Sequence, residues 1–270
     1  MKDETPIPTS NILSSVKPDI PGESGINRAR HLGGLVLSHL NSDLMSPDKF
    51  AKDILNSPVC PAQTRVLKAA GINQRLLVLG APSTGAGITG AMLALHRLVT
   101  RRNHRVLIIS PKRSVLNHCR TQLQDARHFF MLDACNLFSI KSEDGIWSNE
   151  QAEWGLHWRP MTNIPLDALP GCVANEKTII VHDAHQYSPE FLRAINAAAG
   201  PTRQLVFFGV DANRALSEFA QDPAFAVERV SVDQVPYSQR SWINTKREQY
   251  RDHPDAYERI FQRPITWEPR

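Results

Sequence analysis

One stretch, residues 76–89, limits most strongly what this chain can fold into. It reads Leu-Leu-Val-Leu-Gly-Ala-Pro-Ser-Thr-Gly-Ala-Gly-Ile-Thr, an apolar run followed by a glycine-rich turn that leads into a helix-compatible segment. A buried strand, a glycine-rich turn and a helix in this order are the context of a phosphate-binding loop. The glycines let backbone N–H groups point inward, and the helix adds the positive end of its dipole. The stretch predicts such a loop; the alternative is an ordinary glycine-rich turn.

The predicted loop has no lysine. Such loops read G-x-x-x-x-G-K-[ST], in which the lysine holds the β/γ-phosphates and the hydroxyl holds Mg²⁺. With Gly87 as the last glycine, Ile88 takes the lysine position and Thr89 the hydroxyl position. An alternative register ends on Gly85 and places Ala86 at the lysine position. In either register we expect ATP and Mg²⁺ to bind only weakly. The candidate nucleotide-binding residues of the loop are Ser83, Thr84, Gly85, Ala86, Gly87, Ile88 and Thr89, and Thr89 is also a candidate metal ligand.

A second motif, Thr-Ile-Ile-Val-His-Asp-Ala-His at residues 178–185, looks like the D-E-A-H segment of helicase-like ATPases. There the first acid organises Mg²⁺ and the second polarises the attacking water. His182 stands at the first acid and Asp183 at the second; a shift by one residue makes Asp183 the metal acid and leaves Ala184 in place of the base. A neutral imidazole is a poor ligand for Mg²⁺. His182 and Asp183 are therefore the candidate catalytic residues of an impaired site, with Asp183 also a candidate metal ligand.

A transition-metal centre is the alternative reading of the same motif, with His182, Asp183 and His185 as ligands. It is disfavoured, because neighbouring side chains at the end of a strand point to opposite faces.

The order of apolar and amphipathic segments predicts an α/β fold. Strands are expected at 76–80, 105–110, 137–141, 178–181, 204–210 and 227–232, and helices at 89–102, 114–129, 189–199 and 239–262. Alternation of this kind predicts a RecA-like P-loop parallel sheet with helices on both faces. The segment 142–175, with little periodicity, is interpreted as an insertion or long loop. His182 and Asp183 are expected to end the strand adjacent to 76–80, because ligands bind at the carboxyl ends of parallel strands.

Composition divides the chain into four parts. Residues 1–27 are rich in proline, serine and charge and predict a flexible arm, 28–56 a helical lead-in, 57–236 the P-loop core, and 237–270 a C-terminal helical segment. The four cysteines form no C-x-x-C pair, which indicates reduced thiols rather than a zinc or disulfide framework. No signal peptide and no run of about 20 apolar residues is visible, so a soluble intracellular protein without membrane contact is expected.

Positive charge is concentrated between residues 96 and 128. Asp125 is the only acid among eight basic residues, which are Arg97, Arg101, Arg102, Arg105, Lys112, Arg113, Arg120 and Arg127. One-sided charge of this kind favours a polyanion partner such as double-stranded DNA, and the alternative is a solvated helix face. The candidate DNA-binding residues are Arg101, Arg102, Lys112 and Arg113.

Several segments together resemble the ATPase domain of phage terminase large subunits. Pro61-Ala-Gln63 resembles the segment ahead of the phosphate loop, 91–97 the helix after it, and 107–113 the following strand and turn. The resemblance implies a role in viral DNA packaging in the host cytoplasm, with Gln63 reading adenine. It also implies other phage packaging proteins or a separate nuclease chain as partners, and self-association into a homo-oligomer. Segment 209–213 departs from the family's coupling motif.

Competing functions remain open at this point. The first is a degenerate, weakly hydrolysing or non-hydrolysing domain that binds DNA or a packaging partner. The second is an active motor in which a basic residue from elsewhere, such as Arg75, Arg203 or Arg214, replaces the lysine. The third is a structural interaction protein without nucleotide, and a single-lobe helicase-like protein is the alternative family.

Overall fold

The computed structural model describes residues 45–81, 84–129, 138–140, 143–149, 151–161, 164–210, 213–231, 234 and 240–257. The predicted arm (1–27), most of the helical lead-in and the end of the C-terminal segment lie outside them. The described part of the lead-in contains α3 (Pro47–Lys49) and the π-helical turn η1 (Phe50–Ile54). After the sheet, α11 (Arg240–Gln249) and α12 (Pro254–Tyr257) fall within the predicted helical segment 239–262.

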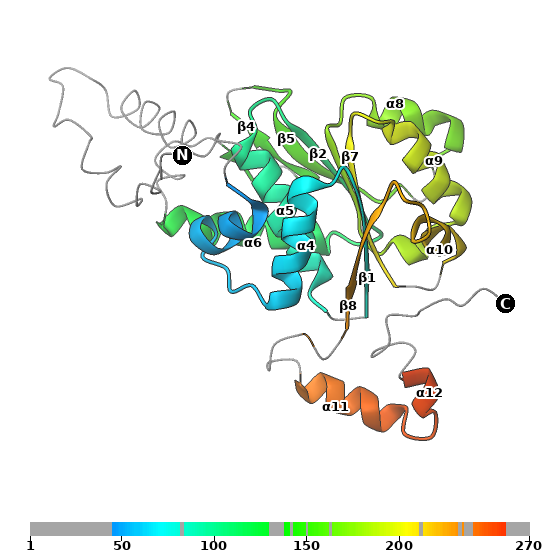
Figure 1. Ribbon diagram of the computed structural model, residues 1–270. Coiled ribbons are helices and arrows are strands. Elements are labelled where there is room, and N and C mark those ends of the chain that lie inside the picture. Colours follow the sequence, from blue (N-terminus) through cyan, green and yellow to red (C-terminus); the bar gives the residue numbers. More distant parts are fainter. Residues whose placement is uncertain are drawn as a thin grey trace, which may run out of the picture.

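The described strands form one mixed sheet in the order β3-β4-β5-β2-β6-β7-β1-β8 (Figure 1). Their bounds are Phe138–Ser139 (β3), Gly145–Ser148 (β4), Gly155–Arg159 (β5), Arg105–Ile109 (β2), Thr178–Val181 (β6), Gln204–Gly209 (β7), Arg75–Gly80 (β1) and Ala226–Val230 (β8). From β5 to β8 all neighbouring strands are parallel, as predicted. The α/β fold class is confirmed.

The interpretation of 142–175 as an insertion or long loop is wrong. The segment contains β4 and β5, which pair with each other antiparallel, and it also contains η2 (Leu166–Ala168) and α8 (Leu169–Val173). Trp147 packs against Gly155, where an added Cβ would collide with the ring. Trp154 is fully buried and donates a hydrogen bond to the Leu98 carbonyl at 2.7 Å. Glycine in this segment obscures the alternating pattern that marks a strand. A glycine is unfavourable in a strand unless a neighbouring side chain, here Trp147, packs over it.

The predicted adjacency of the strands carrying the two motifs is also wrong. β7 lies between β1 and β6, pairing in parallel with both. Strand order depends on where the crossover helices pack, and the sequence of an apolar strand does not specify which strands lie beside it in the sheet. Both strands still point their carboxyl ends at the same edge of the sheet.

Two cores lie on the two faces of the sheet. Leu76 and Val78 face one core and Leu77 and Leu79 the other, because successive residues of a strand alternate in direction. The first core is covered by α4 (Pro61–Ile72), α5 (Ala86–Thr100) and α6 (Ser114–Phe129). The second is covered by α8, α9 (Pro189–Ala199) and α10 (Arg214–Phe219), so helices lie on both faces as predicted (Figure 1).

Helix α4 was not among the predicted elements. Pro61 at its first turn suits a helix start, and the Gln63 side chain accepts a hydrogen bond from the Cys60 backbone N–H at 3.0 Å in a capping arrangement. Arg97 of α5 links α4 to strand β7. It is 3% exposed and donates hydrogen bonds to the Ala70 carbonyl of α4 and to Gln204 Oε1 of β7. Arg97 is therefore a buried structural group rather than part of a charged surface.

Within the part of the chain that the structure describes, no helix is both long and apolar enough to cross a bilayer.

Candidate phosphate-binding site

The predicted loop joins β1, which ends at Gly80, to α5, which begins at Ala86. Gly85 caps the helix in a left-handed conformation with φ of 81°. A Cβ on Gly85 would also lie 2.9 Å from Gln63 Nε2, so both backbone conformation and space require glycine here. The Thr84 hydroxyl donates to the Ala81 carbonyl at 2.8 Å and closes the turn. Pro82 and Ser83 lie outside the described residues.

Gln63 contacts the loop directly. Its Nε2 lies against Gly85, its Oε1 is engaged in the cap of α4, and the residue is only 9% exposed. The resemblance assigned it to adenine, and that role stays a prediction.

The first turn of α5 contains the residues that stand at the lysine and hydroxyl positions in the two alignments of the loop motif. Thr89 is 3% exposed, and its hydroxyl donates to the Gly85 carbonyl at 2.9 Å. Ile88 is 36% exposed. Ala86 and Gly87 stand at the start of the helix, where the loop motif normally ends. Both registers thus leave the first turn without a cationic side chain.

The second motif ends β6 at the same edge of the sheet. The His182 backbone N–H donates to the Ile109 carbonyl at 2.8 Å, which continues the β2–β6 pairing by one residue. Asp183 follows with φ of 54°, a left-handed conformation that is unfavourable for a residue with a Cβ and that is concentrated at functional sites. The chain then enters η3 (Ala184–Gln186).

The His182 ring is 8% exposed, and neither of its nitrogens has a hydrogen-bond partner among the described residues. Nδ1 lies 3.3 Å from Asp183 Oδ2 as an ion-pair contact, without the alignment of a hydrogen bond. The His182 ring, more than any other group, lowers the pKa of the Asp183 carboxyl, and Lys112 contributes to the same direction. These neighbouring groups favour the charged form of the Asp183 carboxyl.

A residue that the sequence did not single out completes the site. His118 of α6 places Cδ2 3.5 Å and Nε2 3.7 Å from the position of a Cβ on Gly87, and His182 Nε2 lies 3.7 Å from the same position. Burial and the neighbouring His182 lower the pKa of His118. No sequence signal marks His118, because only the packing of α6 against α5 brings it to the loop.

The described side chains around the loop offer few ligands for a metal ion. Among the described residues no group of three or more His, Cys, Asp or Glu side chains could hold a metal ion, so the transition-metal alternative with His185 gains nothing. The donors do not fit Mg²⁺ well either: the Thr89 hydroxyl is engaged with Gly85, and an imidazole stands beside Asp183. Thr89 and Asp183 as metal ligands remain predictions.

The structure separates the four candidate DNA-binding residues into two pairs. Arg101 and Arg102 follow the C-terminus of α5, at the amino edge of the parallel strands. Lys112 and Arg113 follow β2 at the carboxyl edge, where the loop lies, and the Arg113 guanidinium stacks 4.9 Å from the Trp158 ring centre. A 15-residue helix such as α5 spans about 22 Å, so the two pairs lie at opposite edges of the sheet rather than in one cluster.

Two of the three arginines considered as substitutes for the lysine are excluded within this chain. Arg75 opens β1 and donates to the Arg203 carbonyl, and Arg203 donates to the carbonyls of Ala174 and Glu176. Both lie at the amino edge, one strand length of about 20 Å from the loop. Arg214 begins α10 near the carboxyl edge and pairs with Glu218 at 3.1 Å.

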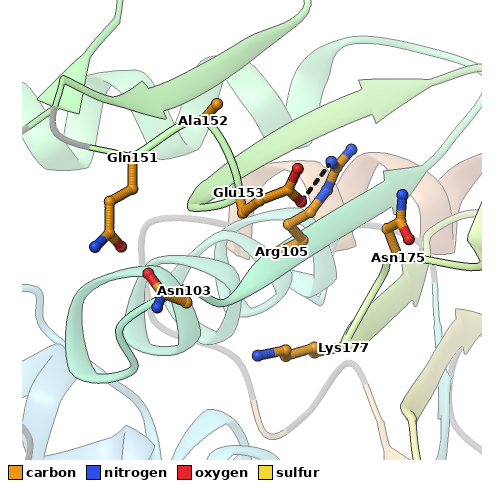
Figure 2. A pocket seen from close by; sticks show the side chains of 7 residues that line it. All are labelled: Asn103, Arg105, Gln151, Ala152, Glu153, Asn175 and Lys177. Carbon is orange, nitrogen blue, oxygen red and sulfur yellow. Dashed lines mark hydrogen bonds and ion pairs between the residues drawn. The ribbon is translucent and has the colours of Figure 1, made fainter.

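A pocket of about 510 Å³ opens at the amino edge and is lined by Asn103, Arg105, Gln151, Ala152, Glu153, Asn175 and Lys177 (Figure 2). Arg105 contacts Glu153 at 3.3 Å and the buried Glu176 at 3.3 Å. Burial raises the pKa of Glu176 to about 7. None of the candidate site residues lines this pocket, so it is separate from the predicted nucleotide site.

Comparison with known proteins establishes the fold. No protein-family model and no curated protein matches the sequence. Among solved structures, the chain is similar to the large terminase ATPase domain of Thermus phage P74-26, with a TM-score of 0.59, and to an arginine-to-alanine variant of that domain, with a TM-score of 0.60. Each match has 11% identity and covers 80% of this chain and 98% of the other. The chain therefore has the RecA-like fold of a phage terminase ATPase domain.

Proposed function

We propose that this chain is a terminase-like ATPase domain of viral DNA packaging that binds nucleotide weakly, hydrolyses ATP negligibly, and binds double-stranded DNA or another packaging protein. On this proposal it works in the host cytoplasm, with self-association or a separate nuclease chain completing the machine. The observation that carries the proposal is the terminase fold combined with a phosphate loop that lacks its lysine.

Retention of the loop architecture supports nucleotide binding. Gly85 keeps the left-handed cap, and a helix of 15 residues starts directly behind it. Backbone N–H groups at such a start attract phosphate without any side chain. The missing lysine argues against turnover, because phosphoryl-transfer catalysis depends on charge stabilisation at the transferring group.

Two assays with the full chain test the proposal. Nucleotide binding with and without Mg²⁺ is expected to be weak and nearly independent of the metal. ATP hydrolysis is expected to stay at the background rate with and without linear DNA, since losing one such electrostatic contact costs roughly a hundredfold to a thousandfold in rate. DNA-stimulated turnover would establish an active motor instead. Absence of nucleotide binding would favour a purely structural protein.

A further inference from the structure

Two imidazoles and the start of α5 converge on one point beside Gly87. His118 Nε2 and His182 Nε2 each lie 3.7 Å from where a Gly87 Cβ would be. The rings come from α6 and from the end of β6, so two different elements aim them at the same helix turn. We propose that His118 and His182 replace the missing lysine and, with the backbone N–H groups of this turn, bind a phosphate group independently of Mg²⁺.

The unpartnered Nε2 of His182 is the observation that points to a ligand. The residue is 8% exposed, and within the described residues Nε2 has no hydrogen-bond partner, whereas Nδ1 contacts Asp183. A buried polar group without a partner costs about 1–3 kcal/mol, so such groups are nearly always satisfied by protein, water or ligand. A ligand oxygen about 2.8 Å from Nε2, in the space that Gly87 leaves open, would satisfy it.

The identity of Gly87 supports the same conclusion. Gly87 is the second residue of α5 and does not have a positive φ, so its backbone conformation does not require glycine. An alanine Cβ would meet the two rings at ordinary contact distances, so sterics within the protein do not exclude it. The absent side chain leaves the space between the rings open.

The chemical class of the ligand follows from the donors. The start of a 15-residue helix offers backbone N–H groups and a positive dipole end, which favour an oxyanion. The charges around the site are the Asp183 carboxylate, 3.3 Å from His182 Nδ1, and Lys112, which acts on Asp183. The carboxylate lies beside Nδ1, the far nitrogen of the ring, and Nε2 binds the oxyanion when it carries a proton, because an unprotonated ring nitrogen is an acceptor. The inference deepens the proposed nucleotide site and rests on it.

Pyrophosphate binding without Mg²⁺, measured by calorimetry on the full chain, tests this assignment. His118→Ala and His182→Ala are each expected to weaken pyrophosphate binding about tenfold or more, as expected for losing one hydrogen bond to a charged group. His185→Ala, a change in the same segment as His182, is the matched control and is expected to bind as the unmodified chain does. Imidazole ¹⁵N signals of His118 and His182 are expected to shift on adding pyrophosphate.

Gly87→Ala separates a binding role from mere packing. The added methyl fills the space between the rings, so pyrophosphate binding is expected to be lost while the free energy of unfolding is unchanged or rises. Normal pyrophosphate binding in Gly87→Ala and in both histidine variants would overturn the histidine assignment and leave the proposed nucleotide binding intact. An unmodified chain that binds neither pyrophosphate nor ATP would overturn both.

Discussion

His182 Nδ1 lies 3.3 Å from Oδ2 of Asp183, and this contact occupies the place where helicase-like ATPases carry two acids. The pair presents one negative charge and one imidazole rather than two carboxylates. On the proposed function, such a pair is expected to bind Mg²⁺ and polarise water poorly, because two acidic residues carry these tasks in helicase-like ATPases. On that proposal, the altered pair and the missing lysine impair the same reaction.

Restoring the lost groups is expected to recover Mg·ATP binding. The triple variant Ile88→Lys, His182→Asp and Asp183→Glu rebuilds the motif in one register. Ala86→Lys with the same changes at 182 and 183 restores the lysine in the other register, in which Gly87 still stands at the hydroxyl position. Because Ile88 is 36% exposed and Ala86 opens the helix, we expect the Ala86→Lys version to bind Mg·ATP more tightly. Calorimetry with and without Mg²⁺ compares them. Equal, metal-independent binding in all three proteins would show that more than these groups is missing.

Gly85→Ala is expected to destabilise the chain by about 1–3 kcal/mol. The left-handed backbone with φ of 81° is unfavourable for alanine, and the methyl would lie 2.9 Å from Gln63 Nε2. Urea unfolding monitored by circular dichroism measures the change. Gly171→Ala is the control, because nothing lies within 4 Å of its added Cβ, and it is expected to unfold at nearly the unmodified urea concentration.

DNA binding is expected to depend on one basic pair rather than on all four residues. Lys112 and Arg113 lie on the edge that carries the loop, whereas Arg101 and Arg102 lie on the opposite edge. Replacing Lys112 and Arg113 by Ala should lower the slope of log K against log salt by about 1.8, since each phosphate contact contributes about 0.9. The Arg101→Ala, Arg102→Ala double variant is the matched control. Fluorescence anisotropy with duplex DNA at several salt concentrations decides, and unchanged slopes in both would assign the charge to a solvated surface.

Acid is expected to destabilise the protein through its buried histidines. His104 is 5% exposed, contacts Thr178 Oγ1 at 2.9 Å, and has its pKa lowered to about 3, mainly by burial and also by Arg101. Its neutral form is favoured in the fold, so stability is full above pH 6.5 and falls as the pH drops and the unfolded chain takes up the proton.

His104→Gln tests this linkage. The variant should lose about 1.4 kcal/mol less stability than the unmodified chain between pH 7.5 and pH 5.5, because one pKa unit corresponds to about 1.4 kcal/mol. Chemical denaturation at the two pH values measures both proteins. His253→Gln, on the exposed turn before α12, is the control and should keep the unmodified pH dependence. An equal loss in His104→Gln would assign the acid sensitivity to other groups.

Local sequence patterns determined the glycine-rich turn between β1 and α5 and most of the sheet. The apolar run 76–80, the glycines behind it and the strand 178–181 were each readable, because strand and helix periodicity and turn chemistry are properties of adjacent residues. The helices 114–129 and 189–199 were also predicted with the bounds that the structure gives. The absence of a lysine from residues 80–89 was readable for the same reason, because it depends only on the order of adjacent residues.

Tertiary structure alone decided which side chains meet at the loop. His118 reaches Gly87 because α6 packs against α5, and β7 separates β1 from β6 because crossover helices set the strand order. The separation of Arg101 from Lys112 across the sheet follows from the length and direction of α5. These relations join residues far apart in the sequence, and they depend on how the helices bury their apolar faces, a choice that no short segment encodes by itself.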